Sequence, residues 1–479
     1  KIVGDFEQEV NEWFLEMFET QLYIAGGGAV CSASDFWNEP EGSYREIFQN
    51  ISKEISFKKL HRYSPKQVIK LNHSGMPDGE RECSICHRHD YLKDGETECE
   101  ICWTLKQMSG NILKGDFFTV TSKKEKTCLP LPGNCYLVTD TESTLRKRMK
   151  EDNYYIRSYS KNKPYSGYYV STKLWVGDYV NGETFEELGQ RATGIERIAV
   201  MRADVDNLGQ AFVRGFENEK NGSKYVTLSR TATFSRKLSM FFKYHINSLL
   251  KEGGYSILEE EAQMEKEDDR RNALIVYSGG DDIFIVGAWD DIIGFAVDLH
   301  DNLMEYSQDT LKISAGIGIY PSKYPISIMA RETGRLEEAA KSVEGKNAVA
   351  LFDEKYTFPW EEFIENVVEE KLYFIQKYFK VVDEKGKNFL YNLLELVRKR
   401  KEDKINIARF AYLLGRMEPK VQRGEKKEEI EEKRDLHREF SRKMYEWIRV
   451  EKDAKELEMA IYLYVYTKRE KEEHDGVNE

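Results

Sequence analysis

The clearest pattern of apolar and polar positions runs from residue 195 to residue 353. Four apolar runs typical of strands occur there, namely "IERIAVMRADVD", "ALIVYSG", "IFIVG" and "LKISAGIGIY". The amphipathic segments "SRTATFSRKLSMFFKYHINSLL" and "DDIIGFAVDLHDNLMEY" lie between them, and "ETGRLEEAAKS" follows before "NAVALFD". The order is therefore β-α-β-β-α-β with an added αβ extension, which predicts a ferredoxin-like fold.

The segments on either side of this region have different patterns. Before it, "FEQEVNEWFLEMF" predicts a helix, "QLYIAGGGAVCSA" a strand interrupted by glycines, and "YREIFQNISKEISFKKL" a second helix. These three elements form an incomplete layer, so we expect the tail of a domain whose start is absent. After it, from about Phe358, five charged amphipathic segments predict a helical bundle.

The remaining stretch combines cysteines with short strand-like phrases. Residues 76–110 hold four of the seven cysteines, and residues 115–185 are rich in Tyr, Val, Thr and Gly. We therefore expect an α+β protein with four domains. Their expected ranges are 1–75, 76–194, 195–355 and 356–479.

Composition and charge narrow the classes of protein. The 479 residues are 40% hydrophobic and 33% charged, as in an ordinary globular protein. No apolar run approaches the length of a membrane span and no secretory signal is visible, so we expect a cytoplasmic protein without membrane contact. The net charge of −12 argues against a surface coated for nucleic-acid binding. Local basic clusters remain at residues 146–148 and 398–401.

Carboxylates follow the first strand and lie in the turn between the second and third. The first strand ends at Asp204 and Asp206, and the turn carries Asp281 and Asp282. In this topology the first and third strands run antiparallel, so the two acidic sites are expected to meet at one edge of the sheet. Such a cluster predicts Mg²⁺ or Mn²⁺, and a pair of ions suits phosphoryl transfer. The alternatives are a plain hairpin, and a capping role for Asp206.

Glycines and lysines near these carboxylates suit a nucleotide triphosphate. Gly279 and Gly280 let phosphates approach the backbone without a Cβ clash. Lys341, at a helix end, and Lys346, in the following turn, are candidates for phosphate contacts. The alternative is that these lysines only complement the helix dipole.

Two CxxC pairs predict a second, structural metal centre. Cys83 and Cys86 form one pair, Cys99 and Cys102 the other, and twelve residues separate them. This spacing fits a tetrahedral zinc site better than a disulfide framework. Four thiolates leave no open coordination position, so we expect the zinc to be structural.

The phrases "RADVDNLG", "TLSRTATFSRKLSMFF", "YSGGDD", "YPISIMARETG" and "AAKSVEGKN" together resemble the large subunit of type III CRISPR effector complexes, particularly the Csm (III-A) type. The resemblance implies two palm domains of the nucleotide cyclase and polymerase type, the first degenerate and only partly present at residues 1–75. It implies that the second palm converts ATP to cyclic oligoadenylates when guide RNA pairs with target RNA.

The resemblance also assigns roles to individual residues. It makes Asp204, Asp281 and Asp282 the ligands of two Mg²⁺ or Mn²⁺ ions. It places the nucleotide against Ser278, Gly279 and Gly280, and its triphosphate near Lys341 and Lys346.

Partners are implied in the same way. They are guide RNA, target RNA, single-stranded DNA, a guide-capping RAMP subunit against the first palm and a helical small subunit against the C-terminal bundle. The HD nuclease that many such subunits carry is not visible. The His-Asp pairs at 89–90 and 474–475 lack its helical context and its further ligands. We therefore expect no DNase activity from this chain.

Two other functions compete with this interpretation. One is a diguanylate-cyclase-like signalling enzyme, although the turn reads GGDDI instead of GGDEF or GGEEF and no RxxD inhibitory site precedes it. The other is a non-catalytic ribonucleoprotein scaffold in which the carboxylates only form a turn.

Overall fold

The fold is known from a computed structural model. It describes residues 2–73, 81–88, 92, 95–151, 153–163, 172–217, 220, 222, 224–259, 263, 270–382, 388–401, 403–419 and 427–469. The chain divides into two compact units, one formed by Lys1–Val176 with Gly209–Arg236 and the other by Gly177–Leu208 with Lys237–Glu479. The α+β class is confirmed. The boundaries of the four expected domains stay predictions.

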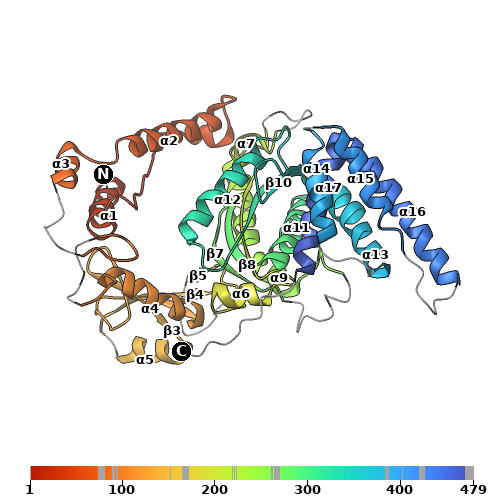
Figure 1. Ribbon diagram of the computed structural model, residues 1–479. Helices are drawn as coiled ribbons and strands as arrows, with labels where there is room; N and C mark the ends of the chain where they lie inside the picture. Colours follow the sequence, from red (N-terminus) through yellow and green to blue (C-terminus); the bar gives the residue numbers. More distant parts are fainter. Residues whose placement is uncertain are drawn as a thin grey trace. The chain divides into compact units, whose positions relative to one another are not determined.

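The second unit contains a six-stranded sheet in the order β11-β10-β9-β6-β8-β7. Its strands are β6 (Ile198–Val205), β7 (Ala273–Gly279), β8 (Asp282–Ala288), β9 (Ile313–Tyr320), β10 (Ala348–Leu351) and β11 (Thr357–Pro359). Strands β7, β8 and β10 of this sheet are labelled in Figure 1. Strand β6 pairs antiparallel with both β8 and β9, and β10 pairs parallel with β9. The predicted ferredoxin-like order with its αβ extension is therefore confirmed.

Helices cover both faces of this sheet. On one face, Ile198 and Val200 of β6 pack with Leu188 of α6 (Phe185–Arg191) and Met329 of α12 (Ile326–Lys341). Ala199, Met201 and Ala203 alternate with these positions and are equally buried, so the other face is also covered. Helix α11 (Trp289–Ser307) packs against β6, β8 and β9. By this alternation, Arg202 and Asp204 share the face that carries α12.

One long helical run precedes β7. The predicted single helix appears as α8 (Leu228–Met240), the π-helical segment η2 (Phe241–His245) and α9 (Ile246–Glu252). Phe241, Phe242 and Leu250 are fully buried. The apolar face of the sequence pattern is therefore the face that packs.

The C-terminal region is helical, as predicted. Its elements are η3 (Glu362–Leu372), α13 (Tyr373–Val381), α14 (Asn388–Lys399), α15 (Ile405–Gly415), α16 (Lys427–Arg449) and α17 (Glu451–Lys468). Helix α17 packs against η3, α13, α14 and α16. A buried ion pair crosses this packing, because Lys371 of η3 and Glu456 of α17 lie 2.7 Å apart and each side chain is 1% exposed.

The first unit combines helices with a smaller sheet. The helices include α1 (Ile2–Phe18), η1 (Asp35–Trp37), α2 (Ser43–Leu60), α3 (Pro65–His73), α4 (Glu100–Lys114), α5 (Glu142–Glu151) and α7 (Leu208–Arg214). The sheet has the order β2-β3-β1-β4-β5, from β1 (Phe117–Thr121), β2 (Leu129–Leu131), β3 (Cys135–Asp140), β4 (Tyr155–Lys161) and β5 (Thr172–Leu174). The strand-rich composition after the cysteines predicted this sheet. Helix α5 within it was missed.

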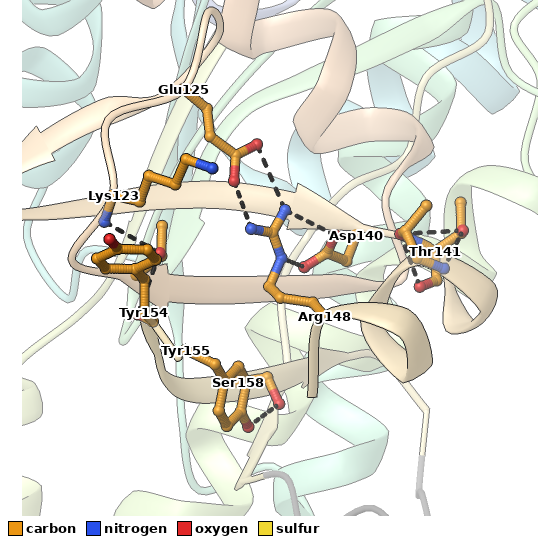
Figure 2. A network of polar contacts seen from close by, with 10 residues as sticks. Lys123, Glu125, Asp140, Thr141, Arg148, Tyr154, Tyr155 and Ser158 are labelled. Atoms are coloured by element: carbon orange, nitrogen blue, oxygen red, sulfur yellow. Dashed lines mark hydrogen bonds and ion pairs between the residues drawn. The ribbon is translucent and has the colours of Figure 1, made fainter. Parts of the chain in front are cut away.

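A polar network ties α5 to this sheet (Figure 2). Arg148 of α5 lies 3.0 Å from Asp140 of β3 and also binds Glu125. The Arg148 side chain is only 13% exposed. In the basic cluster at residues 146–148, the Arg148 guanidinium is therefore already paired with carboxylates of the same unit. In the cluster at 398–401, Arg398 binds Glu458 and Lys401 binds Glu451, but these basic side chains are more exposed than Arg148.

The strand predicted at residues 21–33 is wrong for the described structure, where residues 22–32 have no regular secondary structure. Side chains satisfy backbone groups there in place of a partner strand. The Asn11 amide bonds both backbone groups of Ile24 at 2.8 Å, and Glu54 accepts from the Gly28 N–H at 2.7 Å. A Cβ at Gly27 would lie 2.8 Å from the Ile51 carbonyl oxygen, so the glycine allows close packing on α2.

Candidate active site

The turn between β7 and β8 is a two-residue hairpin made by Gly280 and Asp281. Gly279 and Asp282 face each other across it, and Gly280 has a φ of +69°. A positive φ at the first turn residue alone matches a type II′ turn, which favours glycine at that position. A Cβ on Gly279 would meet neighbouring atoms at 3.5 Å or more, which is ordinary contact. Gly280 is therefore required by its backbone conformation, and not only by the room that a phosphate needs.

Three carboxylates meet at this turn. Asp204 on β6 is the direct cross-strand partner of Asp282 on β8, and the Val205 N–H donates to the Asp281 carbonyl at 3.2 Å. The convergence expected from the topology is thus present. Burial raises the pKa of Asp281, and the charge of Asp204 raises it further. Burial also raises the pKa of Asp282, with Glu337 as the next cause and Arg202 opposing it.

Lys341 lies among these carboxylates. Its ammonium nitrogen is 2.7 Å from Asp204 Oδ2 and 2.6 Å from Glu337 Oε1. Burial alone would lower the lysine pKa, but the hydrogen bonds from Asp204 and Glu337 outweigh it and the pKa is raised. Lys341 is therefore held at the carboxylate cluster, which a lysine that only complements a helix dipole would not require.

Sequence reasoning missed Glu337 and Arg202. Glu337 precedes Lys341 by four residues on α12, the spacing at which a Glu and a Lys meet on a helix. Arg202 precedes Asp204 by two residues on β6, which places both on one face of the sheet. Both spacings were available in the sequence.

Asp206 and Lys346 make hydrogen bonds to residues outside this cluster. Asp206 is 6% exposed, and its Oδ2 accepts from the Ser314 hydroxyl at 2.9 Å and the Asn347 N–H at 3.0 Å. This favours the alternative in which Asp206 fixes a loop. Lys346 donates to Asn207 Oδ1 at 2.8 Å. The Ser278 hydroxyl donates to the Phe242 carbonyl and so ties the hairpin to η2.

The donor chemistry of the cluster suits a hard divalent cation, although among the described residues only the four cysteines form a group whose donor atoms all lie within 4.8 Å of one another. The donors of the cluster are carboxylate oxygens, which Mg²⁺ and Mn²⁺ prefer. The ion pairs of the described residues join two cationic side chains, Arg202 and Lys341, to this group of four carboxylates, and the Lys243 side chain lies near Gly279 of the turn. Those four carboxylates belong to Asp204, Asp281, Asp282 and Glu337.

The four cysteines of the CxxC pairs form a second centre, in the first unit. Their sulfur atoms all lie within 4.8 Å of one another, an arrangement that could hold a metal ion. Burial opposes ionisation of Cys83, but N–H groups, those of Cys86 and Cys99 first, lower its pKa to about 6. Cys99 caps α4 by accepting from the Cys102 N–H. Burial instead raises the pKa of the Cys86 and Cys102 thiols, so backbone donors favour the thiolate at Cys83, and a bound cation would have to favour it at the other two.

The His-Asp pairs at 89–90 and 474–475 lie outside the described residues. Within the described residues, no helix is both long and apolar enough to cross a membrane.

Comparison with known proteins decides the family. The chain is 41% identical over 491 aligned residues to the "CRISPR system single-strand-specific deoxyribonuclease Cas10/Csm1 (subtype III-A)" of Mycobacterium tuberculosis, covering 98% of the chain and 58% of that relative. The Streptococcus thermophilus protein of the same name is 39% identical, with 96% and 57% covered. The chain belongs to the Cas10/Csm1 family. It spans somewhat less than three fifths of the length of these relatives.

Family models place parts of the Cas10/Csm1 pattern along the chain. Csm1 subunit domain B matches residues 1–74, and the Cas10/Cmr2 second palm domain matches residues 197–350. The second helical domain of the Cmr2 subunit of the CRISPR RNA silencing complex matches residues 376–470. The carboxylate cluster therefore lies in the part that matches the second palm.

Solved structures show the same fold. A Csm1–Csm4 cassette in complex with cA4 has a TM-score of 0.65 at 21% identity, covering 98% of this chain and 59% of that one. Csm1 of T. onnurineus has a TM-score of 0.64 at 21% identity, covering 98% and 59%.

Proposed function

We propose that this chain is the nucleotide-cyclising part of a type III CRISPR large subunit, and that it makes cyclic oligoadenylates from ATP in the cytoplasm. The observation that carries the proposal is the meeting of Asp204 with Asp281 and Asp282, beside Lys341, in the region that matches the second palm. Solved relatives of the same fold include Csm1–Csm4 cassettes in complex with cA4, pppApApA and AMPPNP.

In the proposed reaction, the 3′-hydroxyl oxygen of one ATP forms a bond to the α-phosphorus of another. The bond from that phosphorus to the bridging oxygen breaks, pyrophosphate leaves, and the hydroxyl proton passes to solvent. Two bound Mg²⁺ or Mn²⁺ ions would supply charge stabilisation and alignment of the reacting oxygens.

The chain's own residues hold the reactants. Asp204 and Asp282 supply oxygen donors from two paired strands, so the sheet fixes their spacing, and Asp281 supplies its donors from the adjoining turn. Lys341 and Lys346 supply positive charge for the triphosphate. The Gly280 turn fixes the direction of the two following carboxylates.

We propose zinc for the four-cysteine centre, because four thiolates at this spacing suit a closed tetrahedral site. Its role is to hold the loop of the first unit together, with no part in the reaction. One zinc per chain, measured by elemental analysis, tests this. Substitution of Cys102 by Ser should release the zinc and lower the melting temperature.

The solved Csm1–Csm4 relatives support one of the proposed partners, the RAMP subunit. We propose a RAMP subunit of the Csm4 kind, a helical small subunit, guide and target RNA, and single-stranded DNA in the assembled complex. The DNase activity in the names of the curated relatives is not assigned to any residue of this chain, and we propose none for it.

The decisive experiment reconstitutes the complex with guide and target RNA and supplies ATP with Mg²⁺ or Mn²⁺. We expect cyclic oligoadenylates from wild type and none from Asp281→Ala with Asp282→Ala, with assembly intact. Cyclic di-GMP formed from GTP would favour the diguanylate cyclase instead. Activity unchanged by the double substitution would favour the non-catalytic scaffold.

A further inference from the structure

Glu337 is a buried carboxylate beside the proposed active site. It lies on α12, one turn before Lys341, and is 6% exposed. Its Oε1 accepts from Lys341 Nζ at 2.6 Å, and its Oε2 lies 3.2 Å from Arg202 Nε. Each oxygen thus has a cationic partner of its own, as a buried charge requires.

The sheet fixes the place of Glu337. A Cβ at Gly316 would lie 2.4 Å from the Glu337 backbone nitrogen and 2.6 Å from the Thr333 carbonyl oxygen, so α12 rests directly on β9 at this point. Gly316 is also the cross-strand partner of Arg202. The glycine therefore lets the helix approach until the Glu337 carboxylate meets the Arg202 guanidinium.

Lys341 bridges this anchored carboxylate and the reaction site. Its ammonium contacts Glu337 and Asp204 at nearly equal distances, 2.6 and 2.7 Å. An ammonium shared in this way can leave Asp204 and still keep a charged partner. An ion bound at Asp204 would compete with Lys341 for Oδ2 of that carboxylate.

The geometry points to Glu337 as a positioning residue that retains Lys341 when Asp204 engages a divalent ion, and so directs the ammonium toward the phosphates of the bound nucleotide. This inference rests on the proposed function, since it concerns the same site. Two other roles are testable against it. Glu337 can be a ligand of the divalent ion, or it can serve only to hold α12 on the sheet.

The experiment compares Glu337→Gln, Lys341→Met and the double variant in the reconstituted complex. Mn²⁺ affinity is measured by electron paramagnetic resonance without nucleotide, KM and kcat with ATP, and folding by thermal melting. Lys341→Met should bind Mn²⁺ more tightly, because a competing cation is gone. Glu337→Gln should bind Mn²⁺ less tightly only while Lys341 is present, because the ammonium then has Asp204 alone as its charged partner.

For ATP, Glu337→Gln should raise KM about tenfold, the loss of one charge-assisted hydrogen bond, and change kcat less. The double variant should have the KM of Lys341→Met, because the two residues act as one unit. Weaker Mn²⁺ binding in both backgrounds would identify Glu337 as a metal ligand and overturn the inference. A lower melting temperature with unchanged KM would also overturn it.

The proposed function and the role of Glu337 are tested by different measurements. If wild type forms no oligoadenylate, the cyclase assignment is lost. The dependence of Mn²⁺ affinity on Glu337 and Lys341 still decides whether Glu337 retains the lysine.

Discussion

At the scale of single residues, the hairpin separates two glycines that look equivalent in the sequence. Gly280 has a φ of +69°, which costs a side-chain-bearing residue on the order of 1–2 kcal/mol, and Gly279 has no such requirement. We expect Gly280→Ala to lower the free energy of unfolding by about that amount. Gly279→Ala is the matched control and should stay within about 0.5 kcal/mol. Urea unfolding measures both, and equal losses would contradict this account of the turn.

Two ion pairs of equal length but different burial test how much a buried charge pair matters for stability. Lys371–Glu456 and Lys452–Glu362 both measure 2.7 Å, but the first pair is 1% exposed on each side and the second is 56% and 32% exposed. Lys371→Met should cost about 3–5 kcal/mol, because it leaves the Glu456 carboxylate buried without its cation. Lys452→Met should cost less than about 1 kcal/mol.

The Lys371 result has its own control. Adding Glu456→Met to Lys371→Met should recover most of the lost stability, since a buried pair replaced as a whole is often neutral. Denaturant unfolding of the three variants measures this. If the double variant is as unstable as Lys371→Met, the cost comes from lost packing and not from the uncompensated charge.

At the scale of elements, Gly316 controls how closely α12 lies on β9. Gly316→Ala would place a Cβ against helix backbone at 2.4 Å, so the helix must move, at a cost of about 1–3 kcal/mol. The same movement should raise the KM for ATP by shifting Glu337 and Lys341. Gly189→Ala, on α6, is the control, because its Cβ would meet neighbouring atoms no closer than 3.8 Å. Melting and kinetics on both variants decide the question.

Elements also show what could be predicted from sequence. The order of the palm elements was predictable because its apolar runs are long and its helices strongly periodic, and the antiparallel topology then brought Asp204 to Asp282. The strand predicted at 21–33 does not form, because apolar residues alone do not supply a partner strand for the backbone groups. The Lys341 ion pair depends on the distance of α12 from the sheet, which Gly316 sets through tertiary packing.

At the scale of the whole molecule, charge limits what the chain can do alone. The net charge is −12. In the basic cluster at 398–401, Arg398 is paired with Glu458 and Lys401 with Glu451. We therefore expect the isolated chain to bind single-stranded RNA no more tightly than about 10 μM at physiological salt. Fluorescence anisotropy with a labelled RNA measures this. Submicromolar affinity in the absence of other subunits would contradict it.

The pairing of β6 with β8 has a consequence for how this protein can change. Successive residues of a strand point to opposite faces, so one inserted or deleted residue in β6 between Met201 and Asp204 would turn the carboxylate away from Asp282 while leaving the sheet intact. Loops near the turn can gain or lose single residues, but β6 can change length only by two residues at a time. Such a one-residue insertion or deletion would yield a subunit that folds and assembles but lacks the proposed cyclase activity.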